Sequence, residues 1–141
     1  MNETMTKFGY PQTLIHEYEH WCVLLRPKQV TLGSLVLAAR SEATRFSDLS
    51  PASIAEQHQA VADIERVLGE WVQYEKINYL MLMMVDPHVH YHVIPRYSVP
   101  RSFADIEFAD AGWPALPALG DPIAMTPAQN EALITDLRAR W

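Results

Sequence analysis

Three histidines at alternate positions constrain the fold of this chain more than any other feature. His88, His90 and His92 are separated by Val89 and Tyr91, and such β-branched and aromatic fillers favour an extended strand. Side chains alternate between the two faces of a strand, so the three imidazoles are expected on one face and the fillers on the other. In a helix, each step would turn the rings by about 200°, so only a strand would gather them into one site.

Burying three imidazoles together is unfavourable unless each ring is hydrogen-bonded, which argues against a purely structural role. Two functional interpretations remain. A His-x-His pair on a strand can supply two zinc ligands, with a carboxylate, a cysteine or water completing the site. Alternatively, the imidazoles titrate near neutral pH and can carry out nucleophilic and acid–base catalysis.

Few further ligands support the metal interpretation. The lone cysteine, Cys22, lies in an apolar run, and no second ligand pair with a familiar zinc spacing occurs. Asp86 is close in sequence, but strand geometry does not show that it reaches the same centre. The pattern therefore favours catalysis by the imidazoles without a metal or cofactor, with a His-ligated metal hydrolase as an alternative. His16, His20 and His58 are expected to be ordinary surface or satisfied core residues.

Composition and charge exclude several other classes of protein. A chain of 141 residues is long enough for one domain with a real core and short for two. The formal charge of −6 argues against nonspecific binding to nucleic acid or to an anionic membrane. A single cysteine excludes an internal disulfide and suits a reducing compartment. The chain has no signal-peptide pattern, and its longest apolar run, 79–85, is too short to span a membrane. We therefore expect a soluble cytoplasmic protein.

The segments before the histidines predict the first part of a sheet. Residues 1–12 read as a loose lead-in. Alternating or continuous apolar residues then predict three short strands, at 13–20, 21–25 and 34–39. Residues 40–49 read as a polar connection.

Capping residues predict two helices. Ser50 can cap free amide groups, and Pro51 suits the first helical position. Mostly apolar residues then recur at spacings of three and four, at Ile54, His58, Val61, Ile64, Leu68, Trp71 and Val72. Gly69 within this stripe costs about 1 kcal/mol relative to alanine, and it marks either close packing or a frayed helix end. A capping box over 126–129 begins the second helix, with apolar residues at Leu133, Ile134, Leu137 and Trp141.

The remaining segments complete an α+β architecture. Residues 76–85 predict a strand that leads into the histidine strand through a short antiparallel hairpin. Residues 98–125 predict an ordered loop that is docked by Phe103, Phe108 and Trp113. We therefore expect one domain, residues 1–141, with its core over 13–97. It would contain a mainly antiparallel sheet of roughly five strands, a long helix across it and a C-terminal helix.

The histidine stretch resembles the signature of the histidine triad (HIT) family. The sequence His88-Val89-His90-Tyr91-His92-Val93-Ile94 is similar to the family pattern His-φ-His-φ-His-φ-φ, in which φ is hydrophobic, and Pro95-Arg96 continues it. Residues 21–40 resemble the family's earlier strand, turn and Gly-His-φ-φ-Val segment. Together the resemblance covers about residues 13–97 and implies a HIT-like fold.

The resemblance also implies a reaction. In such enzymes the middle histidine, here His90, attacks the α-phosphorus of a nucleotide derivative and forms a nucleotidyl-histidine, which water or another acceptor releases. His88 and His92 would orient the nucleophile, bind phosphate oxygens or assist the leaving group. The implied protein is a homodimeric hydrolase or nucleotidyl transferase without a cofactor. Its substrates would be nucleoside phosphoramidates, dinucleoside polyphosphates or similar conjugates.

Three departures from the family pattern concern the substrate. Arg26 aligns with an aspartate or asparagine that holds the ribose hydroxyls, and arginine is a hydrogen-bond donor only. Ser34 stands where the family's Gly-His pair has its histidine, and 83–87 replaces a Gly-Gln-Ser/Thr-Val loop. The residues expected to bind substrate are Arg26, Ser34, Asp86 and Arg96. The alternative is a noncatalytic nucleotide-binding or dimeric interaction module.

Overall fold

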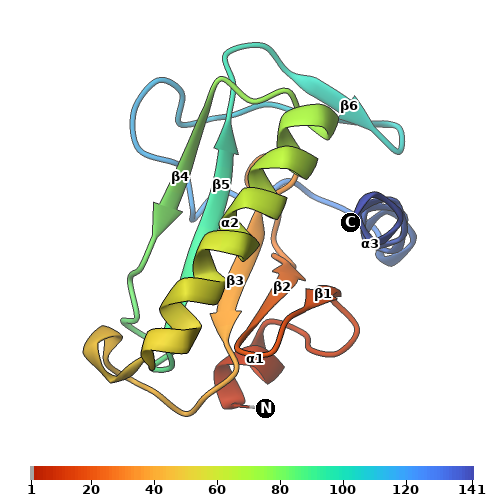
Figure 1. Ribbon diagram of the computed structural model, residues 1–141. Coiled ribbons are helices and arrows are strands. Elements are labelled where there is room, and N and C mark those ends of the chain that lie inside the picture. Colours follow the sequence, from red (N-terminus) through yellow and green to blue (C-terminus); the bar gives the residue numbers. More distant parts are fainter. Residues whose placement is uncertain (1) are drawn as a thin grey trace.

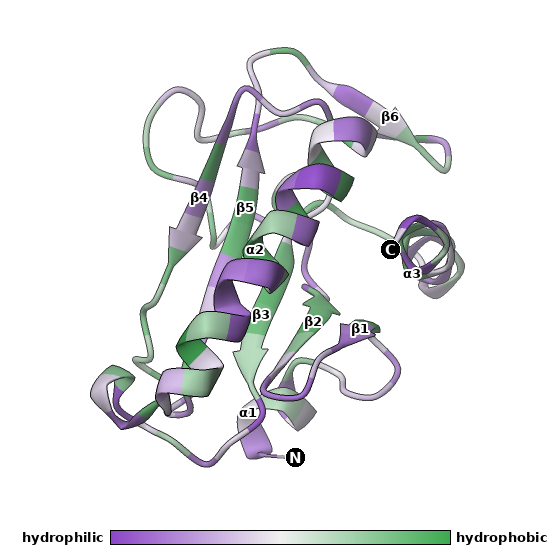
Figure 2. Cartoon of the chain, viewed as in Figure 1, coloured by the Kyte–Doolittle hydropathy of each residue, from purple (hydrophilic) through white to green (hydrophobic). Residues whose placement is uncertain are grey.

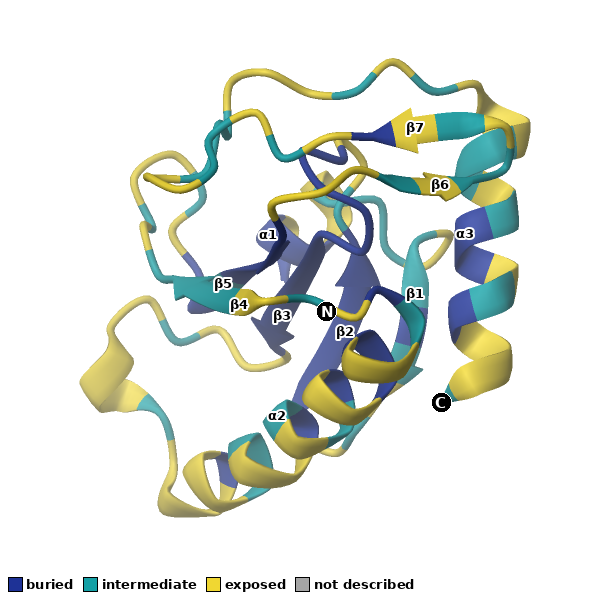
Figure 3. Ribbon diagram, turned by 90° about the horizontal axis from the view of Figure 1, so that it is seen from above, coloured by how far each residue is buried: buried dark blue, intermediate teal, exposed yellow. Residues whose placement is uncertain are grey.

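A five-stranded antiparallel sheet forms the centre of the computed structural model, which describes residues 2–141 (Figure 1). The strands lie in the order β1-β2-β3-β5-β4. Their bounds are β1 (Leu14–Glu17), β2 (Trp21–Leu25), β3 (Leu35–Ala39), β4 (Lys76–Leu80) and β5 (His90–Arg96). The predicted α+β class, the sheet of about five strands and the two longer helices are therefore confirmed. β2 and β3 are buried on both faces, as their continuous apolar runs predicted (Figure 3).

The helix α2 (Pro51–Trp71) runs diagonally across one face of the sheet (Figure 1). The predicted cap is present, because the backbone N–H of Ser53 donates to the Ser50 hydroxyl at 3.1 Å. The predicted stripe is wrong near the start of the helix, where Ile54 is 44% exposed. Ser53 and Ala60 face the sheet instead, because small residues let the helix lie close. There, Trp21 Nε1 donates to the Ser53 carbonyl at 2.7 Å.

Two glycines near α2 have opposite environments. Gly33 has a φ of +84°, and a Cβ there would lie 3.0 Å from both Leu68 Cδ2 and Val72 Cγ2. Glycine is therefore required at this turn for its conformation and for the close approach of the helix. A Cβ at Gly69 would meet no atom within 4 Å, and α2 continues past it to Trp71. It marks neither close packing nor a frayed end.

The N-terminal segment is not a loose lead-in over the described residues. The short helix α1 (Glu3–Lys7) lies on the face of the sheet opposite α2 (Figures 1 and 3). Asn2 caps it by accepting from Met5 N at 2.9 Å, and its amide donates to the carbonyls of Ala39 and Ser41. Met5 packs into a smaller core cluster with Cys22, Leu24, Val36 and Ala38. A five-residue helix is too short for an apolar periodicity to reveal it.

The C-terminal part also contains more structure than the expected loop. A hairpin of β6 (Arg101–Phe103) and β7 (Ile106–Phe108) turns at Ala104 and Asp105, both of which have positive φ. Ala-Asp lacks the glycine that marks most such turns, so the sequence did not reveal it. Phe108 is buried as predicted, whereas Trp113 remains partly exposed and lies outside the main core cluster.

The helix α3 (Pro127–Arg140) packs beside β1 and has the predicted capping box. It buries Leu133, Ile134 and Leu137, as its pattern predicted. The strongly apolar strands lie between α1 and α2, whereas much of the outer side of α2 is hydrophilic (Figure 2). None of the helices in residues 2–141 has the length and apolar character that a membrane span requires.

Candidate active site

The histidines lie on the face of the sheet that α1 covers. In β5, His90 pairs with Ala38 and His92 with Val36 of β3, whereas Val89 and Val93 belong to the core beneath α2. His88 precedes the strand. The neighbouring backbone remains attached to the sheet, because Val89 O accepts from Ala39 N at 3.0 Å. The alternation of faces therefore follows the sequence pattern, although β5 begins at His90.

The connection before the triad is longer than the predicted hairpin. β4 ends at Leu80, so residues 81–89 form a loop, in which Met83 has a φ of +48° and Met84 is 87% exposed. Its apolar run has the composition of a strand, but these residues are not part of the sheet. Asp86 Oδ1 lies 2.8 Å from Lys7 Nζ, so the loop is tied to α1 by an ion pair.

His88 has partners at both ring nitrogens. Its Nδ1 lies 2.9 Å from the Thr4 hydroxyl, and its Nε2 lies 3.1 Å from a carboxylate oxygen of Glu42. The backbone N–H of His88 also donates to the Thr4 hydroxyl, at 3.3 Å. A carboxylate can only accept, so Nε2 carries a proton that it donates to Glu42. The orientation of His88 is thus set by α1 on one side and by the β3–α2 connection on the other.

His90 is held by the main chain. Its Nδ1 lies 2.7 Å from the backbone oxygen of His88. A carbonyl oxygen can only accept a hydrogen bond, so Nδ1 is the protonated nitrogen. In the neutral ring, Nε2 then carries the free lone pair. The side chain is almost fully buried, with 1% exposed.

His92 is a buried imidazole without a fixed partner at one nitrogen. Its Nδ1 has no hydrogen-bond partner among residues 2–141. Burial, assisted by His90 and Arg26, lowers the pKa of His92 to about 4, and Asp86 opposes this shift. The ring is therefore neutral at neutral pH. Its centroid lies 5.2 Å from that of His90, and the Phe8 ring lies 5.5 Å and 5.6 Å from His90 and His92.

Two of the residues expected to bind substrate lie near the triad. Arg26 and Asp86 both act electrostatically on His92. Arg26 lines a cavity of about 220 Å³ together with Lys7, Phe8, Pro27 and Lys28. Because Phe8 also contacts His90 and His92, this cavity adjoins the histidines. The expected substrate-binding role of Arg26 and Asp86 therefore stays a prediction.

The other two residues have structural partners. Ser34 is fully buried, and its hydroxyl donates to Thr31 O at 2.8 Å and accepts from Thr31 N at 3.1 Å. Arg96 forms a buried ion pair with Asp110, from Nε to Oδ2 at 2.7 Å, and also donates to Asn78 and to a carbonyl. Ser34 therefore stabilises a turn and Arg96 anchors the C-terminal loop. We do not retain either residue as a substrate ligand.

Sequence reasoning missed Thr4, Phe8 and Glu42. All three depend on where α1 and the β3–α2 connection pack, which no pattern in the sequence indicates. The available signal was Asn2, a residue type that favours the position before a helix. Even with that signal, the contact between α1 and the histidines would not have been predicted.

Metal ligands do not gather in the part of the chain that the structure describes. No group of three or more His, Cys, Asp and Glu side chains there is arranged to hold a metal ion. Cys22 is buried in the small core cluster on the α1 face, and burial raises the pKa of its thiol to about 12. It is therefore an uncharged core residue.

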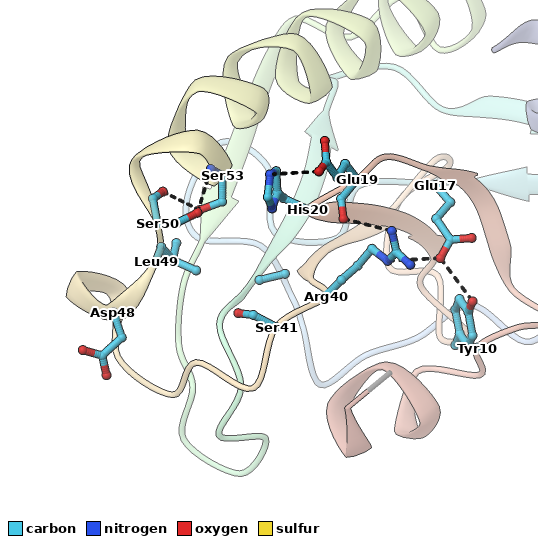
Figure 4. Close-up of a pocket in the computed structure, with 11 residues that line it drawn as sticks. Tyr10, Glu17, Glu19, His20, Arg40, Ser41, Asp48, Leu49, Ser50 and Ser53 are labelled. Atoms are coloured by element: carbon cyan, nitrogen blue, oxygen red, sulfur yellow. Dashed lines mark hydrogen bonds and ion pairs between the residues drawn. The ribbon is translucent and has the colours of Figure 1, made fainter.

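A second hollow, of about 470 Å³, lies between the start of α2 and Arg40 (Figure 4). It is lined by polar residues that largely satisfy one another. Arg40 pairs with Glu17 at 3.1 Å and donates to Glu19 O at 2.9 Å, and Tyr10 donates to Glu17 at 3.2 Å. The residues that line it include no triad histidine. The candidate site is therefore assigned to the histidine face.

Comparisons with known proteins show the family and the fold of the chain. The family model described as the HIT domain matches residues 8–99. A histidine triad protein from Bradyrhizobium japonicum is 21% identical, with a TM-score of 0.74, and the match covers 99% of this chain and 96% of that chain. For a histidine triad protein from Sinorhizobium meliloti, the identity is 18%, the TM-score 0.76 and the coverages 100% and 96%.

A third similar structure has a more informative name. It is described as a hypothetical histidine triad nucleotide-binding protein from Sulfolobus tokodaii. It is 16% identical, with a TM-score of 0.66, and the match covers 91% of this chain and 82% of that chain. No curated protein matches the chain. At these identities, the three structures show a shared fold.

Proposed function

Because the chain belongs to the HIT-domain family, we propose that it is an enzyme that cleaves nucleotide conjugates at the α-phosphorus through a nucleotidyl-histidine. The substrate class is nucleoside phosphoramidates, dinucleoside polyphosphates or similar conjugates, and the reaction is hydrolysis or nucleotidyl transfer. The observation that carries the proposal is the hydrogen bond from His90 Nδ1 to the His88 carbonyl. It leaves Nε2 as the nucleophilic nitrogen. The name of the Sulfolobus protein, which describes it as nucleotide-binding, supports the ligand class.

In the proposed first step, the lone pair on His90 Nε2 forms a bond to phosphorus. The bond from phosphorus to the leaving group breaks, and its electron pair departs with that group. His90 becomes cationic, and its Nδ1–H then makes a charge-assisted hydrogen bond to the His88 carbonyl. That bond is already formed in the free protein, so it needs no rearrangement during the reaction.

The flanking histidines have different proposed roles. The unpartnered Nδ1 of His92 supports a hydrogen bond from this nitrogen to a phosphate oxygen, for which a neutral ring in the Nδ1–H tautomer suffices. His88 is held by Thr4 and Glu42, and its protonated form is the group that can give a proton to an amine leaving group. In the second step, water attacks phosphorus, the N–P electron pair returns to Nε2, and a proton of water passes to His88, which regains the proton that it gave to the leaving group.

One observation favours a binding protein without turnover. His88, His90 and His92 are all buried in the free structure, with exposures of 8%, 1% and 8%. The cavity that Arg26 and Phe8 line is the proposed route by which substrate reaches Nε2. If substrate cannot displace the contacts of α1, the chain binds nucleotide but does not react with it.

A substrate screen separates the two functions. Adenosine phosphoramidates, diadenosine polyphosphates and nucleotide sugars are incubated with the wild-type chain and with His90→Ala. The proposal expects turnover of at least one class by the wild type and almost none by the variant. Nucleotide binding by calorimetry without turnover of any class would identify a binding module.

The proposed enzyme is a homodimer. β4 is an edge strand of the sheet, so its outer backbone groups are available for contact with another chain. Several large apolar side chains near this edge are exposed, namely Leu82, Met84, Val85 and Leu116. The first three lie in the loop that follows β4, and Leu116 lines a cavity together with residues of β4. Contact with a second copy would cover such residues.

A further inference from the structure

The cavity beside the triad is lined by cations. Lys7, Arg26 and Lys28 contribute three positive charges, and Asp86 is the carboxylate paired with Lys7. The whole chain carries a formal charge of −6, so this cluster opposes the overall charge. A positive cavity within a negative chain attracts small anions while bulk charge repels polyanions. With a volume of about 220 Å³, the cavity is of a size for part of a small molecule.

The guanidinium of Arg26 is oriented but incompletely paired. One terminal nitrogen donates to the backbone oxygen of Lys28. Nε is buried and has no hydrogen-bond partner within the described chain. Burial also lowers the pKa of the Arg26 side chain. A desolvated, planar guanidinium with an unused donor is suited to an anion that accepts through two oxygens, such as phosphate or carboxylate.

The cavity adjoins the reacting group through Phe8, although no triad histidine lines it. The Phe8 ring lines the cavity and also contacts the rings of His90 and His92. Arg26 lies close enough to His92 to influence its titration. An anion held by Arg26 therefore lies beside the phosphorus that His90 is proposed to attack, rather than at a separate surface site.

We propose that this cavity binds a second phosphate of the substrate, distinct from the phosphate that reacts with His90. The inference rests on the proposed function and narrows its substrate class to nucleotide conjugates with two phosphate groups. The second phosphate lies either on the sugar or further along a polyphosphate chain. A nucleotide with an unmodified sugar and a single phosphate leaves Arg26 Nε without an anionic acceptor.

Calorimetric binding measurements test this without requiring turnover. The ligands are AMP, adenosine 2′,5′-bisphosphate, adenosine 3′,5′-bisphosphate and ADP. At least one ligand with two phosphates is expected to bind the wild-type chain about tenfold more tightly than AMP, as one hydrogen-bonded charge pair provides. Preference for a sugar bisphosphate places the second phosphate on the ribose, and preference for ADP places it on the polyphosphate chain.

Variants then assign the preference to Arg26. In Arg26→Gln, the affinity for the preferred two-phosphate ligand relative to AMP is expected to fall to a ratio of about one. Arg26→Lys is expected to keep part of the preference, because its charge remains without the planar fork. Arg45→Gln is the matched control, because Arg45 is an exposed arginine paired with Asp48 and should keep the wild-type ratio. If Arg26→Gln does not fold, Arg26→Lys and Lys28→Gln replace it in the test, and each is expected to lower the affinity ratio relative to the wild type.

Equal binding of all four ligands by the wild type would overturn the inference. An unchanged ratio in the Arg26 and Lys28 variants would do the same. A nucleotidyl adduct on His90 together with equal binding would remove only the second-phosphate site. A clear preference for two phosphates without any adduct would keep that site and contradict the proposed chemistry.

Discussion

His90 Nδ1 lies 2.7 Å from the backbone oxygen of His88. The tautomer of the proposed nucleophile is therefore set by the main chain, not by the side chain of its neighbour. The acceptor remains when the His88 ring is removed. The backbone of His88 therefore orients His90, and the ring of His88 is free to have a separate role.

His88→Ala should therefore still form the His90 adduct. The variant loses the ring held by Thr4 and Glu42 but keeps the carbonyl that accepts from His90. Turnover should fall by about 100-fold, the scale of one acid–base contribution. Single-turnover kinetics with intact-mass detection measure both quantities. A folded His88→Ala chain that forms no adduct would show that the ring itself sets up the nucleophile.

The depressed pKa of His92 predicts a loss of stability in mild acid. The pKa is about 4 in the folded chain, and the ordinary value is 6.5. Between these two values, the unfolded chain binds a proton that folded His92 does not bind. Stability should therefore fall as pH falls from 6.5 towards 4, by at most about 1.4 kcal/mol per pH unit from this group.

Urea unfolding from pH 7 to pH 5 measures this effect. His92→Asn is the comparison, because its side chain does not titrate in the range. The stability of the variant should depend less on pH than that of the wild type. Identical pH slopes for the two chains would mean that His92 keeps an ordinary pKa in the folded state.

Gly69→Ala and Gly33→Ala should change stability in opposite directions. At Gly69 a Cβ enters open space in the last turn of α2, so alanine should add up to about 1 kcal/mol to the free energy of unfolding. At Gly33 the positive φ and the contacts with Leu68 and Val72 should make alanine destabilising. Urea midpoints of the two variants check the pair. Destabilisation by Gly69→Ala would mean that another surface packs against that position.

The homodimer proposal predicts a mass of twice the 16.1 kDa of one chain. Light scattering at micromolar concentration measures it directly. Met84→Lys should weaken association, because this exposed methionine lies in the loop that follows the edge strand β4. A single species with the mass of one chain would contradict the proposal.

Much of the sheet was predictable because its strands are apolar on both faces or alternate cleanly. The run 21–25 predicted β2 at its observed bounds, and the cap at Ser50 predicted the start of α2. Local chemistry determines these features. The turn at Ala104 and the five-residue helix α1 have weak local signals, so their structure depends on packing.

The candidate site was only partly predictable for the same reason. Alternation in the sequence predicted that the histidines share one face and the residues between them the other. It did not predict that the backbone oxygen of His88 would accept from His90, or that Thr4 would reach His88 from 84 residues away. Arg96 was expected to bind substrate because it is close to the triad in sequence. The sequence did not reveal that its guanidinium is buried in an ion pair with Asp110.

Rapid-quench mass spectrometry tests the central claim, that His90 Nε2 forms a covalent bond to phosphorus, most directly. The wild-type chain is mixed with a substrate that it turns over, quenched, and weighed intact. Peptides are then mapped at neutral pH, because a phosphoramidate is labile in acid. His90→Gly with added imidazole is a companion, because free imidazole can occupy the vacated space.

The account predicts one nucleotidyl group on His90 of the wild type and none on His90→Ala, with turnover of the variant reduced by about 10⁴-fold or more. An adduct on His88 or His92 would contradict the assignment of the nucleophile. Wild-type turnover by His90→Ala that a chelator abolishes would show that a metal ion, rather than this imidazole, carries out the reaction.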